Sequence, residues 1–400
     1  MDLNSMPSSE RLHIGFFGMR NAGKSSLVNS VTGQALSLVS DVKGTTTDPV
    51  KKAMELLPLG PVVIVDTPGM DDEGQLGEMR VQRARAMLDT VHIAVLVIDG
   101  MEGLRPEDEA LLKLIAERKL PHVIVMNKAD CIAQGAERPA GALAVSAKTG
   151  EGVAQLKEKL AALCRERAQV RPIVSDLIDA GDTVLLVMPI DEAAPKGRLI
   201  LPQQQTIRDI LDHHGMAVCC QPEEIGAMLS MLSRPPKLVI TDSQAFARVA
   251  KDVPPEIPLT SFSILMARRK GSLAMQVRGA AALSQLRDGD TVLIAEGCTH
   301  HRQCGDIGSV KIPAWIERFT GKKVQYRFVS GGEYPQDFSD IALVLHCGGC
   351  MLPETAMRAR MQRAKAAGVP VVNYGVAIAH MHGILRRSLE LFPDMLELLD

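Results

Sequence analysis

The chain has 400 residues, of which 46% are hydrophobic and 23% charged, so it holds more apolar material than one hydrophobic core can bury. Its net charge of −2, from 45 basic and 47 acidic residues, gives no indication of a nucleic-acid partner. No apolar run approaches the ~18 residues of a membrane span, and the N-terminus lacks a signal-peptide pattern. We expect a cytoplasmic protein of three domains without a membrane partner, whose eight cysteines are reduced unless a metal binds them.

A phosphate-binding loop follows the first predicted strand. Residues 11–18 are rich in apolar side chains, residues 18–25 read Gly-Met-Arg-Asn-Ala-Gly-Lys-Ser, and a helical pattern comes next. In this context the glycines let backbone N–H groups surround phosphates, Lys24 reaches the terminal phosphates and the Ser25 hydroxyl binds Mg²⁺. The residues assigned to the nucleotide here are Gly18, Asn21, Ala22, Gly23, Lys24, Ser25 and Ser26.

The segment 44–49, Gly-Thr-Thr-Thr-Asp-Pro, is similar to the first switch of the translation-factor-related GTPases. A threonine completes the Mg²⁺ shell in that class, and Thr46 is the best match for it. Asn21 resembles the asparagine that holds K⁺ against the phosphates in potassium-activated members of the class. The alternative is that Asn21 is only a residue well suited to a loop.

The next predicted strand places Asp66 beside the metal and leaves Gly69 to direct its N–H at the γ-phosphate. Lys24, Thr46 and Gly69 are therefore the predicted catalytic groups. Met70 follows, where many GTPases carry the glutamine that orients the attacking water. Because methionine cannot orient water, we predict slow intrinsic GTP hydrolysis that K⁺ or a partner accelerates.

Two further strand patterns, at 122–130 and 142–148, predict guanine recognition. An aspartate at position 130 that accepts two hydrogen bonds from the guanine edge selects GTP over ATP. All these motifs stand at carboxyl ends of strands, where doubly wound sheets bind ligands. We therefore predict a P-loop GTPase domain at 1–172 that binds GTP or GDP with Mg²⁺. The residues expected at the base are Asn127, Lys128, Asp130, Ser146, Ala147 and Lys148.

Strand and helix patterns continue to alternate after the first domain. Strands are predicted at 180–190 and 235–242, and the prolines of 253–259 suggest a boundary. The alternation is typical of α/β domains with mainly parallel sheets. We therefore predict two smaller α/β domains, at 173–260 and 261–400.

Two apolar runs of strand length in the last domain end in thiols and imidazoles. Adjacent parallel strands would bring the two ends to one edge of a sheet, and cytosolic cysteines grouped in this way indicate a metal site. Zinc would take three thiolates and one imidazole, whereas an iron–sulfur cubane would take the three thiolates and leave its fourth iron to another ligand. The residues alone are compatible with both zinc and an iron–sulfur cluster. The candidates are Cys298, His300, His346, Cys347 and Cys350.

A guanine-nucleotide domain followed by Cys-x-His and, far downstream, His-Cys-x-x-Cys resembles the HydF family of [FeFe]-hydrogenase maturation GTPases over essentially the whole chain. The resemblance implies a GTPase domain, a dimerisation domain at 173–260 and a [4Fe–4S]-binding domain at 261–400. It also implies a homodimer or larger assembly that receives a di-iron precursor from radical-SAM maturation enzymes and delivers it to apo-[FeFe]-hydrogenase. Cys298, Cys347 and Cys350 would be the cluster ligands, with His300 and His346 as supporting or exchangeable groups.

Two other functions compete with this one. A ribosome- or tRNA-associated GTPase with a zinc-binding C-terminal module would fit the switch pattern, but the balanced charge and the 3% aromatic content oppose it. A redox enzyme would need a complete cluster site, and three evident cysteine ligands instead of four oppose that. Cys304, close to Cys298, is a substitute ligand or an ordinary thiol.

Overall fold

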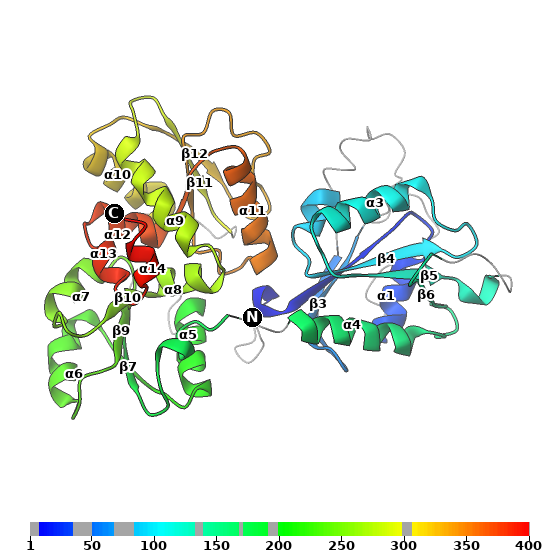
Figure 1. Cartoon of the computed structure of the whole chain (residues 1–400), viewed down its shortest axis with the longest axis horizontal. Helices are drawn as coiled ribbons and strands as arrows, with labels where there is room; N and C mark the ends of the chain where they lie inside the picture. Colours follow the sequence, from blue (N-terminus) through cyan, green and yellow to red (C-terminus); the bar gives the residue numbers. More distant parts are fainter. Residues whose placement is uncertain are drawn as a thin grey trace. The chain divides into compact units, whose positions relative to one another are not determined.

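The computed structural model describes two compact units, Met1–Gln169 and Val170–Asp400 (Figure 1). No helix among the described residues is long and apolar enough to cross a lipid bilayer. The described residues are 8–34, 50–67, 84–132, 139–167, 171–190, 199–297 and 306–399.

The first unit contains a six-stranded sheet in the order β2-β3-β1-β4-β5-β6. Only β2 and β3 are antiparallel to each other, and every other neighbouring pair in this sheet is parallel. The strands are β1 (Leu12–Phe17), β2 (Val50–Leu56), β3 (Gly60–Asp66), β4 (Ile93–Asp99), β5 (His122–Asn127) and β6 (Leu143–Ala144). The helical segments are η1 (Ser8–Glu10), α1 (Lys24–Thr32), α3 (Pro106–Glu117), η2 (Ala129–Cys131) and α4 (Val153–Arg167).

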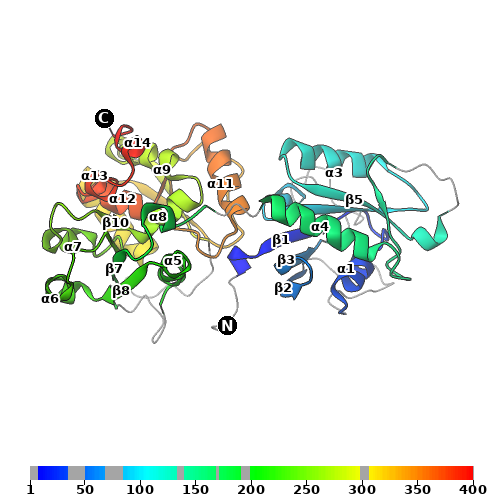
Figure 2. The ribbon, with the colours of Figure 1, turned by 60° about the horizontal axis from the view of Figure 1, so that its bottom comes forward.

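Helices cover both faces of this sheet, so its central strands are apolar on both sides. Figure 2 shows α1 and α4 on one face and α3 on the other, and each face has its own core cluster. In β1, Phe16 packs in the cluster with α1 and α4, while Phe17 packs in the cluster with α3. Near-continuous apolar runs are the expected result in a sheet buried on both sides.

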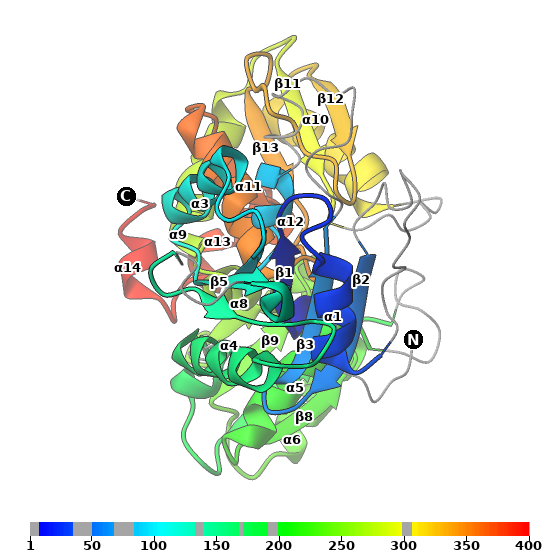
Figure 3. The ribbon, with the colours of Figure 1, turned by 90° about the vertical axis from the view of Figure 1, so that its right-hand side faces the viewer.

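The second unit contains two four-stranded sheets, ordered β10-β9-β7-β8 and β12-β11-β13-β14, in which all paired strands are parallel. Figure 3 shows β11, β12 and β13 side by side. The first of these sheets consists of β7 (Thr183–Val187), β8 (Met216–Cys220), β9 (Leu238–Thr241) and β10 (Leu259–Ser261). The second consists of β11 (Thr291–Ala295), β12 (Gln325–Val329), β13 (Leu343–His346) and β14 (Val371–Asn373). The predicted α/β fold class with mainly parallel sheets is confirmed.

Helices join the two sheets of the second unit into one hydrophobic core. Leu186 of β7 and Ile294 of β11 belong to the same buried cluster. Thr260 also donates a hydrogen bond to the Ser388 carbonyl oxygen at 2.9 Å, so the end of the chain packs on β10. The α-helices are α5 (Leu201–Asp212), α6 (Ile225–Met231), α7 (Phe246–Asp252), α8 (Phe262–Arg269), α9 (Leu273–Ala280), α10 (Ile312–Thr320), α11 (Glu354–Ala366), α12 (Tyr374–Met381), α13 (Leu385–Ser388) and α14 (Pro393–Leu396). Shorter 3-10 or π segments are η3 (Ser175–Leu177), η4 (Pro222–Glu224), η5 (Ala281–Gln285) and η6 (Ile307–Lys311).

Candidate functional site

The loop between β1 and α1 requires glycine at two positions. Gly18 has a φ of 144°, and a Cβ atom there would lie 2.1 Å from the Val97 carbonyl oxygen of β4. Gly23 has a φ of 81°, and its Cβ would lie 2.2 Å from Nδ2 of Asn127. Asn21 adopts a left-handed conformation as well, with a φ of 60°. The loop therefore lies tightly against the ends of β4 and β5, with its backbone placed to surround a ligand.

Ser25 and Asp66 lie together at the start of α1 and the end of β3. The Ser25 hydroxyl donates to Oδ2 of Asp66 at 2.8 Å. Asp66 is 4% exposed, and its Oδ1 atom has no hydrogen-bond partner in the described part of the chain. A buried carboxylate oxygen without a partner beside a hydroxyl is a suitable ligand pair for Mg²⁺. Lys24 donates from Nζ to the Met19 carbonyl oxygen at 2.7 Å, so its ammonium group lies over the same loop.

The predicted base-binding residues meet at the ends of β5 and β6. Ser146 donates from Oγ to Oδ1 of Asp130 at 2.6 Å, and this hydrogen bond lowers the pKa of the Asp130 carboxyl. A charged carboxylate is the form that accepts two hydrogen bonds from guanine. Asn127 accepts from the Ala147 backbone N–H at 3.0 Å and donates to the Ala22 carbonyl oxygen at 2.9 Å. Asn127 therefore links the base-binding loop to the phosphate-binding loop.

Asp99 is a residue of this site that the sequence analysis missed. Lys128, with a φ of 62°, donates from Nζ to Oδ2 of Asp99 at 2.6 Å. Asp99 ends β4, and a carboxylate at the end of an apolar strand beside the other motifs was the available signal. Two residues of the predicted nucleotide site, Thr46 and Gly69, lie outside the described residues, as does Met70.

The two strands that lead to the thiols are neighbours. β11 and β13 are parallel and place Ala295 beside His346. The sulfur of Cys347 accepts hydrogen bonds from the backbone N–H of Gly297 at 3.0 Å and of Gly349 at 3.3 Å. The end of β11 therefore reaches the Cys347 sulfur. Cys298, His300 and Cys304 lie outside the described residues, as do any contacts that they make.

A tight turn joins Cys347 and Cys350, the two candidate thiol ligands that the structure describes. Gly349 has a φ of 59°, and a Cβ atom there would lie 2.4 Å from the Met357 sulfur. Lys270, which follows α8, donates from Nζ to the carbonyl oxygens of Gly348 and Gly349, the first at 3.3 Å. The turn thus directs the Gly349 N–H at the Cys347 sulfur, while the Lys270 ammonium group binds two of its carbonyl oxygens.

His346 is fully buried, and both of its ring nitrogens have partners. Nδ1 lies 2.7 Å from the Cys347 carbonyl oxygen and Nε2 lies 3.0 Å from Nη1 of Arg360. Burial, followed by the charge of Arg360, lowers the pKa of His346 to about 3. The imidazole is therefore neutral, with its proton on Nδ1 and with Nε2 accepting from the guanidinium. In this arrangement His346 has no nitrogen lone pair left for a metal.

The surroundings of Cys347 fit a metal-bound thiolate. Burial raises the pKa of the Cys347 thiol, while the Gly297 and Gly349 N–H groups lower it. Two amide donors stabilise a charged sulfur, and hydrogen bonds to sulfur are also a feature of iron–sulfur sites. No group of three or more metal-ligating side chains occurs among the described residues, a set that excludes Cys298.

Comparison with known families identifies each part of the chain. Residues 13–128 match the 50S ribosome-binding GTPase family, so the first unit carries a GTPase domain. Residues 173–271 match the hydrogen maturase F dimerization domain and residues 274–391 match the hydrogen maturase F tetramerization domain. These two matches together span more than half of the chain. The chain belongs to the hydrogen maturase F (HydF) family.

Curated relatives match part of this HydF family member. The tRNA modification GTPase MnmE of Nitrosospira multiformis is 34% identical over 158 residues, which are 38% of this chain and 34% of that protein. GTPase Der of Nitratidesulfovibrio vulgaris is 37% identical over 125 residues, 30% of this chain and 25% of that protein. The chain spans about a third of the length of the first of these curated relatives.

Solved structures resemble the chain over a comparable part. A structure of an Aquifex aeolicus Era variant bound to GDP and AlF4− has a TM-score of 0.33 and 20% identity, covering 52% of this chain and 92% of that chain. A probable GTP-binding protein engB has a TM-score of 0.30 and 24% identity, covering 39% of this chain and 100% of that chain.

Proposed function

We propose that this protein is a GTP-hydrolysing scaffold or carrier that binds a [4Fe–4S] cluster, receives a di-iron precursor and transfers it to apo-[FeFe]-hydrogenase. The observation that carries the proposal is the Cys347 sulfur, which accepts two backbone N–H groups where β11 meets β13. Membership in the HydF family supports a role in hydrogenase maturation. The tRNA modification relative matches 38% of this chain and 34% of its own length, so it gives less support to the ribosome- or tRNA-associated alternative.

Cys298, Cys347 and Cys350 are the proposed ligands of the cluster. His346 supports Cys347 through its hydrogen bond to the Cys347 carbonyl oxygen and is not a ligand, because both of its nitrogens are engaged. His300 stays a candidate for the fourth position. When bound, the cluster would supply an iron atom whose fourth ligand can exchange, which suits a site that accepts and releases cargo.

In the GTPase domain, Lys24 would stabilise the charge on the terminal phosphates, and Ser25, Asp66 and Thr46 would bind Mg²⁺. Gly69 would contribute its N–H to the γ-phosphate. Asn21 lies in the phosphate-binding loop with a left-handed backbone conformation, and it is the proposed K⁺ contact. With a methionine at position 70 the intrinsic turnover would be slow.

The proposed domains are the GTPase domain at 1–172, a dimerisation domain at 173–260 and a cluster-binding domain at 261–400. The matched dimerization and tetramerization domains support a homodimer or a larger assembly. Radical-SAM maturation enzymes, as the source of the precursor, and the apo-hydrogenase are the proposed partners in the cytoplasm.

Anaerobic purification and metal analysis test the cluster directly. We expect a brown protein that contains iron and sulfide and loses both in Cys347→Ser and Cys350→Ser variants. Cys219→Ser is the matched control, because Cys219 is an exposed cysteine on β8 in the other sheet of this unit. A colourless protein that contains zinc would contradict the proposal and favour the zinc-module alternative.

The nucleotide switch needs a separate test, since it requires an element that both sites influence. We expect GTP to change the release of hydrogenase from the wild-type protein and to have no effect on a Lys24→Ala variant. Equal release from both proteins would remove the switch from the proposal and leave cluster binding untouched.

A further inference from the structure

Arg360 of α11 is a buried cation whose partners in the described portion of the chain include no carboxylate. It is 5% exposed, and no carboxylate lies within ion-pair distance of it among those residues. Its guanidinium contacts His346 Nε2 at 3.0 Å, the Gly331 carbonyl oxygen and the face of Tyr334, whose ring centre is 5.0 Å from Cζ. A buried guanidinium normally requires a negative partner, because it stays charged in proteins.

The nearby group that can become negative is the sulfur of Cys347, the residue after the His346 partner of the guanidinium. Burial lowers the pKa of the Arg360 guanidinium, and the charges of Tyr334 and Cys347 oppose that shift. Burial also raises the pKa of the Tyr334 phenol to about 12, so Tyr334 is neutral near pH 7. Of the described residues whose charges act on Arg360, Cys347 is the one whose sulfur becomes a thiolate when it binds a metal.

Two further acidic groups act on Cys347. Cys350 and Glu296, which is 5% exposed and follows β11, both raise the pKa of the Cys347 thiol. Two hydrogen bonds connect Arg360 through His346 to the Cys347 carbonyl oxygen. The guanidinium therefore also fixes the orientation of the residue that carries the sulfur.

We propose that Arg360 is the counter-cation of the metal–thiolate centre at Cys347: it positions this ligand through His346 and raises the midpoint potential of the bound centre. The inference rests on the proposed cluster-binding function. Thiolate ligands give an iron–sulfur centre negative charge, and reduction adds one electron to it. A fixed positive charge nearby in a medium of low dielectric constant stabilises the reduced form more than the oxidised form.

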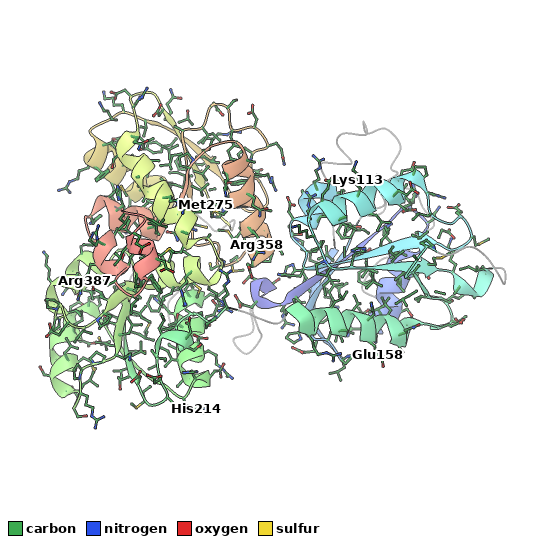
Figure 4. All side chains as sticks on the ribbon, in the orientation of Figure 1. Lys113, Glu158, His214, Met275, Arg358 and Arg387 are labelled. Carbon is green, nitrogen blue, oxygen red and sulfur yellow. The ribbon has the colours of Figure 1, made fainter. Side chains whose placement is uncertain are left out.

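The test is a redox titration of the anaerobically reconstituted full-length protein, followed by electron paramagnetic resonance. Arg360→Gln keeps a side-chain amide that can donate to His346 but removes the charge, so its midpoint potential should shift to more negative values. Arg360→Lys keeps the charge and should stay near the wild-type potential. The matched control is Arg358→Met on the same helix, labelled in Figure 4, which removes an exposed charge that is paired with Glu354 and should leave the potential unchanged.

An unchanged potential in Arg360→Gln, or equal shifts in the Gln and Lys variants, would overturn the inference. If the Gln variant loses its native circular dichroism spectrum, the Lys variant decides alone, since a lowered potential with the charge retained contradicts the proposal. A wild-type protein that binds no iron–sulfur centre would instead refute the proposed function and this inference with it.

Discussion

The nucleotide site and the thiol site are both built at carboxyl ends of parallel strands, but different atoms hold them in place. In the nucleotide site, close neighbours restrict the loop: the Gly18 position faces a backbone carbonyl oxygen of β4 and the Gly23 position faces the Asn127 side chain. In the thiol site, long side chains act from outside: Lys270, which follows α8, donates to the turn, and Arg360 of α11 contacts His346 beside it. The first arrangement tolerates little change in the loop itself, and the second depends on side chains that can be replaced outside the turn.

The largest expected effect is on GTP turnover. Lys24→Ala should lower the rate of GTP hydrolysis by about 10²–10³-fold, the usual loss when a group that stabilises transition-state charge is removed. Iron content should stay at the wild-type value, because the two sites lie in separate compact units. Lys113→Ala on α3, an exposed lysine labelled in Figure 4, is the control and should keep wild-type turnover. Loss of iron in the Lys24 variant would contradict the independence of the two sites.

A second prediction concerns the Val97 carbonyl oxygen that faces Gly18. Gly18→Ala should destabilise the first unit by about 1–3 kcal/mol, because the new methyl group would overlap the Val97 carbonyl oxygen and the residue would hold a strained φ. Hydrogen exchange of the β1 amides measures the change. Gly103→Ala, at a φ of 72° with open space around its Cβ, isolates the conformational cost and should lose about 1 kcal/mol. Equal losses of stability in both variants would show that the Val97 carbonyl oxygen has no effect.

The thiol turn should respond differently to the same substitution. Gly349→Ala also meets a positive φ, but its Cβ faces the Met357 side chain, which can move. We expect a stability loss of about 1 kcal/mol, below that of Gly18→Ala. Iron content should fall by more than this stability loss explains, because the shift would displace the Gly349 N–H from the Cys347 sulfur. Full iron occupancy would mean that this hydrogen bond is dispensable.

The smallest effect is a dependence of the first unit on pH. Burial lowers the pKa of His13, whose Nε2 lies 2.8 Å from the Ser8 carbonyl oxygen and whose Nδ1 has no hydrogen-bond partner in the ranges that the structure describes. The unfolded state therefore binds a proton first as the pH falls, so the stabilising contribution is complete above about pH 6.5 and decreases below it.

Protection of the β1 amides should accordingly fall as the pH decreases below about 6.5, and His13→Gln should flatten that dependence. An equally steep fall in the His13→Gln variant would assign the effect to other groups.

The sequence alone determined the α/β fold class, the parallel sheets and the family, because its motifs are short and each stands directly after an apolar strand pattern. Gly18, Lys24 and Ser25 are close in sequence, so local geometry is sufficient to bring them to one phosphate-binding loop. The adjacency of the two thiol-bearing strand ends was also predicted, from the rule that parallel strands share an edge, and the pairing of β11 with β13 confirms it.

Only the tertiary structure decided which groups surround those motifs. Asp99 beside Lys128, Asn127 between the two nucleotide loops, and Arg360 and Lys270 at the thiol turn all depend on side chains that meet across long stretches of chain. Helical periodicity marks Arg360 as one arginine among several in α11, and nothing in that pattern says which of them turns inward. The reason is physical: motif spacing fixes local backbone geometry, whereas burial and charge pairing depend on how separate elements pack.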